Sequence, residues 1–163
     1  MKHLVIFVPT GFEDVELIAS LDVFQRNNIS YDLFSVENLT EVKGKYEAIV
    51  KTKNTSEFNY KNYKGIFLPG GPGHKILLES DFVIEVLKKF ESDKKIISAI
   101  CAAPDVLLKA DVIKENKITS FPGHAKINNN TQEEVVVSKN IVTGRDFKST
   151  ISFAEKLVEV LNA

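Results

Sequence analysis

Cys101 is the one cysteine of this 163-residue chain, so its thiol cannot form an intramolecular disulfide. A single thiol is either a small core residue or a reactive nucleophile. The apolar run over 95–100 leads directly into it, and Pro104 suits the first turn of a helix that follows. The sequence therefore predicts a sharp strand-to-helix bend at Cys101, similar to a nucleophile elbow, where the positive helix end and unpaired N–H groups would favour the thiolate.

Glu16 is an acid among apolar neighbours, whereas Glu13 and Asp14 fit the ordinary place of acids in the first turn of a helix. A carboxyl in an apolar crevice has a raised pKa. A protonated Glu16 could donate a hydrogen bond to a Cys101 thiolate and lower the pKa of the thiol. An ionised Glu16 would do the reverse.

The run 69–73 is rich in glycine and ends an apolar stretch. Gly70 and Gly71 allow close backbone approach, so their N–H groups could hold an oxyanion. The alternative is a plain turn. The pattern is neither G-x-G-x-x-G nor a P-loop, so a nucleotide site has weak support, and we expect no cofactor.

The three histidines, His3, His74 and His124, are scattered along the chain. Their spacing is not that of metal ligands, so we expect no metal site. His74 and His124 each follow a glycine close to the end of a predicted strand, and either could reach the same edge of the sheet. A lone histidine is more often a surface or capping residue, which is the interpretation we favour for both.

Apolar runs alternate with amphipathic stretches, which is typical of a parallel sheet covered by helices. In such a sheet the strand-to-helix turns share one edge, so the turns at 11–16, 70–73 and 100–104 should converge. The expected strands are 4–8, 31–36, 65–68, 95–100 and 117–121, with a hairpin over 134–137 and 140–143, and a peripheral strand or hairpin arm over 45–53 after a turn at 43–44. The expected helices run from about 15 to 26, from 82 to 90, from 102 to 109 and from 149 to 161.

The composition is that of an ordinary globular chain, with 44% hydrophobic and 26% charged residues. It excludes disordered and disulfide-rich classes and suits one domain over 1–163. The net charge of −1 gives no field that would attract nucleic acid or a membrane surface. No apolar run reaches the roughly 18 residues of a membrane span, and the run 4–8 is too short for a signal peptide. We expect a cytoplasmic protein without nucleic-acid or membrane partners.

Four segments together resemble the DJ-1/PfpI (ThiJ) superfamily, in order and over nearly the whole chain. They are 11–16 (GFEDVE), 68–71 (LPGG), 99–104 (AICAAP), and 143–145 (TGR) followed by Phe153 and Ala154. The resemblance implies a flavodoxin-like three-layer α/β sandwich with a mainly parallel central sheet. It also implies a homodimer of the DJ-1-like branch.

The resemblance further implies site roles. Cys101 would be the reactive cysteine, and Glu16 the buried acid that hydrogen-bonds it. The amides of Gly71 and Ala102 would form the oxyanion pocket, with Gly70 beside them. Arg26 matches an arginine that lies near the pocket of the partner subunit in DJ-1-like dimers.

Two positions depart from the family pattern. Ala102 stands where protease-like and chaperone-like branches have a histidine, which argues against a Cys–His peptidase. Phe121 stands where DJ-1 has a histidine before a proline, which argues against strong glyoxalase activity. The sequence leaves open whether His74 or His124 replaces that histidine.

Two functions therefore compete. The first is cofactor-independent chemistry on small 2-oxoaldehydes, of the glyoxalase or deglycase type, in which the Cys101 thiolate attacks the aldehyde. The second is an oxidative-stress sensor or chaperone-like protein whose cysteine oxidises to the sulfinate without substantial turnover. A flavodoxin-like module that binds a phosphate ligand is a third and weaker alternative.

Overall fold

A seven-stranded sheet forms the centre of the computed structural model, which describes all residues from 1 to 163. The strand order is β5-β2-β1-β6-β7-β9-β8, and every pair is parallel except β8 with β9. The predicted mainly parallel α/β fold is confirmed. The strands are β1 (Lys2–Phe7), β2 (Tyr31–Ser35), β3 (Glu41–Lys43), β4 (Ile49–Lys51), β5 (Lys53–Asn54), β6 (Tyr63–Leu68), β7 (Ile96–Ile100), β8 (Val135–Ser138) and β9 (Ile141–Gly144). The helices are α1 (Asp14–Arg26), α2 (His74–Leu78), α3 (Asp81–Ser92), α4 (Pro104–Lys109) and α5 (Thr150–Asn162).

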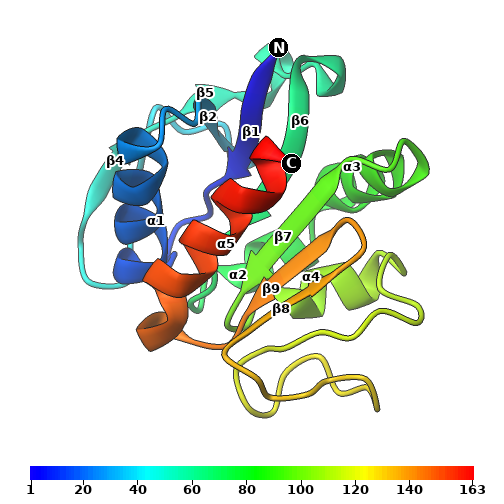
Figure 1. Cartoon of the computed structure of the whole chain (residues 1–163). Coiled ribbons are helices and arrows are strands. Elements are labelled where there is room, and N and C mark those ends of the chain that lie inside the picture. The colour runs from blue at the N-terminus through cyan, green and yellow to red at the C-terminus, as the bar shows by residue number, and fades with distance from the viewer.

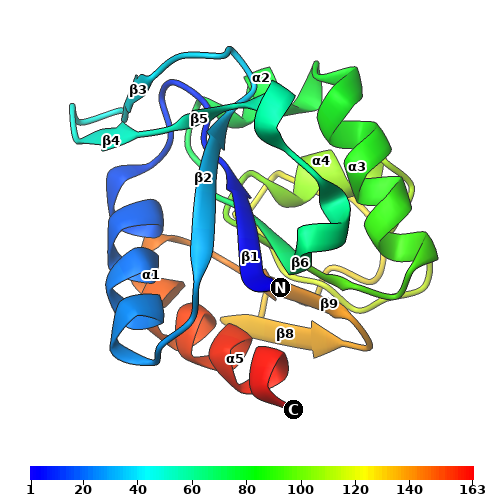
Figure 2. The same cartoon turned by 90° about the horizontal axis from the view of Figure 1, so that it is seen from above.

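Helices cover both faces of the sheet, so the molecule has three layers (Figures 1 and 2). Helices α1 and α5 lie on one face, and α2, α3 and α4 on the other. A hydrophobic core lies on each face of the sheet, and alternate residues of β1 pack into the two cores. Val5 and Phe7 belong to one core, and Leu4 and Ile6 belong to the other. Burial on both faces explains why the central strands read as continuous apolar runs. No helix combines the length and apolar character needed to cross a bilayer.

The predicted strand over 117–121 is wrong. Only an isolated bridge between Ile118 and Asn130 forms there, and the N–H of Thr119 donates to the side-chain hydroxyl of Thr143 in β9 instead of to a backbone carbonyl of that strand. An apolar run signals burial, which Ile118 has, but it does not guarantee a partner strand.

Three other boundaries differ from expectation. The segment 45–53 is not one strand, because β3 and β4 pair as a hairpin whose turn occupies 44–48. The Asp14 carboxylate holds this turn by accepting the N–H groups of Tyr46 and Ala48, each at 2.8 Å. Helix α2 was not expected, because five residues are too few to show helical periodicity. Helix α4 starts at Pro104 rather than at 102, since the preceding residues form a turn.

Candidate active site

The turns at 11–16, 70–73 and 100–104 meet at the carboxyl edge of the sheet, as predicted. Glu13 N–H donates to the Gly70 carbonyl oxygen, and Gly73 N–H donates to that of Gly11, each over 2.9 Å. The turn at 100–104 packs against the turn at 70–73 so closely that a Cβ placed on Gly70 would stand 2.8 Å from Cys101 Cβ. Backbone contacts therefore hold these loops together.

Cys101 forms the predicted bend between β7 and α4. Its φ of +63° is in the left-handed region, which costs an L-residue roughly 1–2 kcal/mol. Backbone bonds on both sides hold it there: its N–H donates to Gly144 O (2.9 Å), and its carbonyl accepts from Phe121 N–H (2.8 Å). The residue is only partly buried and lines a pocket, so it is not a sealed core residue.

Glu16 is fully buried in the first turn of α1, and the side chain of Glu13 caps this helix by accepting the N–H of Glu16 over 2.8 Å. Its Oε1 accepts the N–H of Gly70 over 3.1 Å, whereas Oε2 is the one buried side-chain polar atom without a partner of good hydrogen-bond geometry. Burial, reinforced by the charge of Glu13, raises the pKa of Glu16 to about 8, although interactions with the Cys101 thiol and Gly70 oppose the rise. The carboxyl is thus mainly protonated at neutral pH.

The surroundings of Cys101 disfavour the thiolate, although the strand-to-helix bend predicted that they would favour it. Burial, and then the negative charge of an ionised Glu16, raise the pKa of the Cys101 thiol well above its usual range, and only the N–H of Ala102 lowers it. Two neighbouring negative charges in a buried site repel each other strongly. The thiolate is therefore compatible with the site only while Glu16 keeps its proton.

Two backbone amides beside the thiol donate to no oxygen of the protein. These are the N–H groups of Gly71 and Ala102, the predicted oxyanion pair. Gly70 is different from what we expected, because its N–H already donates to Glu16 Oε1. Gly70 consequently positions the acid rather than an oxyanion.

A pocket of about 750 Å³ opens over Cys101 and has a largely apolar lining. The exposed rings of Phe121 and Phe147 flank it. The other lining residues are Glu13, Val15, Glu16, Lys45, Tyr46, Gly71, Pro72, His74, Lys75, Ala102 and His124. A larger hollow of about 1090 Å³ lies between the ends of α3 and α4, but it is lined mainly by charged and polar groups and contains none of the predicted site residues.

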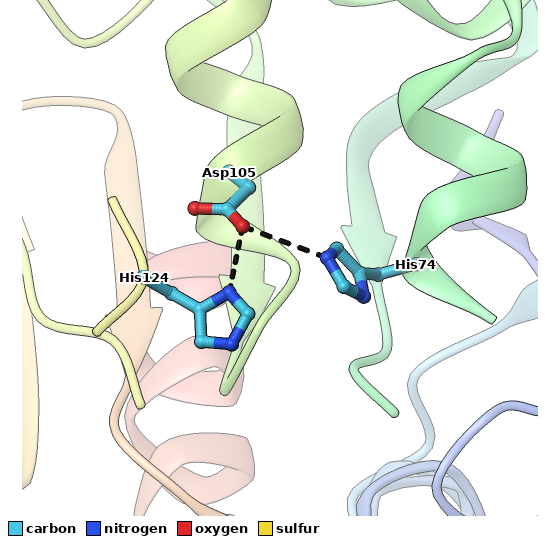
Figure 3. Close-up of side chains that lie close together, drawn as sticks. All are labelled: His74, Asp105 and His124. Atoms are coloured by element: carbon cyan, nitrogen blue, oxygen red, sulfur yellow. Dashed lines mark hydrogen bonds and ion pairs between the residues drawn. The ribbon is translucent and has the colours of Figure 1, made fainter. Parts of the chain in front are cut away.

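Both His74 and His124 reach this pocket, contrary to our interpretation of them as surface or capping groups. Their rings lie 5.3 Å apart between centroids, and the Asp105 carboxylate lies between them (Figure 3). Asp105 was not among the predicted site residues. The three residues come from α2, α4 and the loop after Phe121, so no spacing along the chain could have identified the cluster.

Arg26 lies at the far end of α1 from Glu16 and does not reach the pocket of its own chain. Its side chain is exposed, and its Nε donates to Asp22 Oδ2, one turn earlier, over 2.7 Å.

Known proteins resemble this chain over nearly its full length. The family model for the DJ-1/PfpI family matches residues 2–160. YraA of Bacillus subtilis, whose name proposes a cysteine protease, is 33% identical over 88% of this chain and 89% of its own. The glutathione-independent glyoxalase DJR-1.2 of Caenorhabditis elegans is 29% identical over 97% of this chain and 87% of its own. Among solved structures, Drosophila melanogaster DJ-1beta superposes with a TM-score of 0.91, at 28% identity, covering 98% of this chain and 90% of that one.

Proposed function

Because the chain belongs to the DJ-1/PfpI family, we propose that it is a cysteine-dependent enzyme that converts small 2-oxoaldehydes such as methylglyoxal into 2-hydroxy acids without a cofactor. One observation carries the proposal: the buried Glu16 carboxyl, whose Oε2 has no partner of good hydrogen-bond geometry, interacts with the Cys101 thiol. A protonated acid and a thiol in contact are what such chemistry needs, because one proton can be exchanged between them.

The first step is addition of sulfur to the aldehyde. With Glu16 protonated, the Cys101 thiolate forms a C–S bond to the aldehyde carbon, and the carbonyl π electrons move to oxygen. The free N–H groups of Gly71 and Ala102 are the donors available for that oxyanion. The product is a hemithioacetal.

The second step is proton transfer along the substrate. After Glu16 has given its proton to the oxyanion, its carboxylate removes the hydrogen of the former aldehyde carbon as a proton and returns it to the adjacent carbon, while the proton of the new hydroxyl passes to the ketone oxygen. The electron pair of the broken C–H bond reduces the neighbouring ketone while the aldehyde carbon becomes a thioester. Water then hydrolyses the thioester, so that methylglyoxal and water give lactic acid and restore the thiol.

The pocket supports a small carbonyl substrate. Its largely apolar lining and aromatic rings suit a small uncharged molecule. The name of the Caenorhabditis elegans relative, a glutathione-independent glyoxalase, agrees with this class of substrate. The same thiol could act on carbonyl adducts, as in deglycase chemistry.

A peptidase fits the site less well. Position 102 is alanine, so no imidazole follows the cysteine directly. Two histidines do line the pocket, but His124 Nδ1 is engaged with Asp105 and His74 Nδ1 with the carbonyl of Gly71. We therefore retain small-carbonyl chemistry as the proposal.

We further propose that the protein is a cytoplasmic homodimer without nucleic-acid partners, built from single domains spanning 1–163. Exposed apolar side chains on the packed helices α1 and α5 suit such an interface, namely Val15, Ile18 and Ile151. In that dimer Arg26 would lie near the pocket of the second subunit.

Oxidation sensing is the second candidate. The partly exposed thiol, the unpartnered Oε2 and the two free amides could equally bind the oxygens of a Cys101 sulfinate. An addition of two oxygens confined to Cys101 after mild peroxide treatment, with no turnover of carbonyls, would favour this function.

The test is lactate formation from methylglyoxal by the purified protein. Cys101→Ala should abolish it, and Glu16→Gln should lower it by at least about 100-fold, the usual effect of removing a general acid–base group. Glu85→Gln makes the same chemical change on the exposed surface of α3 and should leave the rate unaltered. Substantial turnover by either site variant would reject the mechanism.

A further inference from the structure

His74, Asp105 and His124 form a compact cluster beside the thiol pocket (Figure 3). His124 Nδ1 lies 2.6 Å from Asp105 Oδ2, and His74 Nε2 lies 3.5 Å from the same oxygen. One ligand-type atom from each side chain falls within 4.8 Å of the others. Two imidazole nitrogens thus converge on one carboxylate oxygen.

The orientation of His74 is fixed by its other nitrogen. Nδ1 is 2.9 Å from the carbonyl oxygen of Gly71, which can only accept, so Nδ1 carries the hydrogen. In the neutral ring Nε2 then presents a lone pair, and it points at Asp105 Oδ2, which is also an acceptor. Two acceptors facing each other at 3.5 Å call for a cation between them, either a proton or a metal ion.

Asp105 is held in the same way. Its Oδ1 accepts the backbone N–H of Ala125 over 2.5 Å, which leaves Oδ2 to face the two rings. Metal-binding histidines and carboxylates usually have such outer hydrogen bonds, because these fix the tautomer and the direction of the ligand atom. Both the Gly71 and the Ala125 contacts already exist without a metal.

We propose that His74 Nε2, Asp105 Oδ2 and His124 Nδ1 bind a divalent transition-metal ion of the zinc type. Two imidazoles and one carboxylate are a ligand set that zinc accepts. Ligand atoms around a tetrahedral zinc ion are about 3.3 Å apart, and the observed separations of 2.6 and 3.5 Å from Asp105 Oδ2 lie on either side of that value. The two imidazole nitrogens lie within 4.8 Å of each other, and rotation of the rings would bring them toward that spacing.

Three protein ligands leave the fourth coordination position for water or for a ligand oxygen. His74 and His124 line the pocket over Cys101, so the ion would lie at the wall of that pocket. The side chains of Asp105 and His124 remain 23% and 31% exposed, which gives the ion a route from solvent. Because His124 Nδ1 must give up its hydrogen to the solvent, binding should weaken as the pH falls.

The experiment uses the full chain without an affinity tag, treated with chelator and titrated with Zn²⁺ by calorimetry. Wild-type protein should bind one ion, and Co²⁺ should give the visible absorption of a tetrahedral site. His74→Gln and His124→Gln should each weaken binding at least about tenfold, as loss of a supporting group already does in metal sites. Circular dichroism of each variant checks that it is folded.

Two controls locate the ion. His3→Gln removes a histidine outside the cluster and should leave Zn²⁺ affinity unaltered. Cys101→Ala should also retain binding, because the thiol is not among the proposed ligands. If Zn²⁺ does not bind, or binds equally well to both folded cluster variants, the proposal is wrong and the three side chains form only a hydrogen-bonded triad. If Cys101→Ala abolishes binding, the thiol holds the ion and the proposed ligand set is overturned. Neither result depends on the proposed carbonyl reaction.

Discussion

Glu16, on α1, and Cys101, at the bend between β7 and α4, approach each other across Gly70. A Cβ on Gly70 would stand 2.5 Å from Glu16 Oε1 and 2.8 Å from Cys101 Cβ, so only glycine fits between them. The N–H of Gly70 completes the arrangement by donating to Oε1. A single residue without a side chain thus lets a buried acid and a strained cysteine share one site.

The alkylation rate of the Cys101 thiol should depend on the coupled titration of Glu16 and Cys101 rather than on the ionisation of Cys101 alone. Since Glu16 has a pKa of about 8 and an ionised Glu16 opposes the thiolate, the pair loses one proton near pH 8 and keeps the other. Alkylation of the wild-type thiol by iodoacetamide should rise with a midpoint near pH 8 and then level off.

In Glu16→Gln the thiol titrates alone, at a pKa raised by burial, so its alkylation should keep rising at alkaline pH. Cys101→Ala corrects for labelling at other groups. Identical profiles for the wild type and Glu16→Gln would show that the two groups are not coupled.

Protein stability should depend on pH through the same carboxyl. The folded state holds the Glu16 proton with a pKa of about 8, against 4.5 for an ordinary glutamate. This contribution is fully present below pH 4.5 and is lost as the pH rises to about 8, a difference on the order of a few kcal/mol. Urea unfolding at several pH values should therefore show a steeper decline for the wild type than for Glu16→Gln. If the free energy of unfolding fell equally with pH in the wild type and in Glu16→Gln, the raised pKa of the buried Glu16 carboxyl would be contradicted.

Gly71→Ala should destabilise the protein more than Gly123→Ala. Both glycines have positive φ, +93° and +90°, so alanine costs about 1–2 kcal/mol at either position. A Cβ at Gly71 would also collide with the backbone N of Glu13, whereas one at Gly123 would meet nothing within 4 Å. Overpacking adds a further ~1–3 kcal/mol at Gly71. Equal unfolding free energies for the two variants would argue against the close contact of the two loops.

Arg26→Ala tests the proposed dimer. Because the arginine contacts only Asp22 of its own helix, its loss should leave the melting temperature of the chain unaltered. Light scattering after size exclusion should give twice the monomer mass for the wild type. If the partner pocket uses this arginine, lactate formation should fall several-fold while the fold is retained; a wild-type monomer would remove the basis for that role.

The sequence by itself determined the layered α/β fold, because continuous apolar strands and amphipathic helices alternate along the chain and each pattern has one stable way to be buried. It also determined the bend at Cys101, since the buried run 95–100 and Pro104 leave few residues for the turn. It could not predict the short α2, nor the absence of a strand over 117–121, because both depend on what packs against them.

Only the tertiary structure decided the pKa of the Cys101 thiol and which side chains lie together at the pocket. The raised pKa of Cys101 arises from how deeply the thiol is buried and how close Glu16 lies, and neither quantity is encoded in local sequence. The cluster of His74, Asp105 and His124 draws on segments 31 and 19 residues apart, which parallel β6 and β7 bring to one edge of the sheet. Side chains distant along the chain become neighbours there because all strand-to-helix turns of a parallel sheet share that edge.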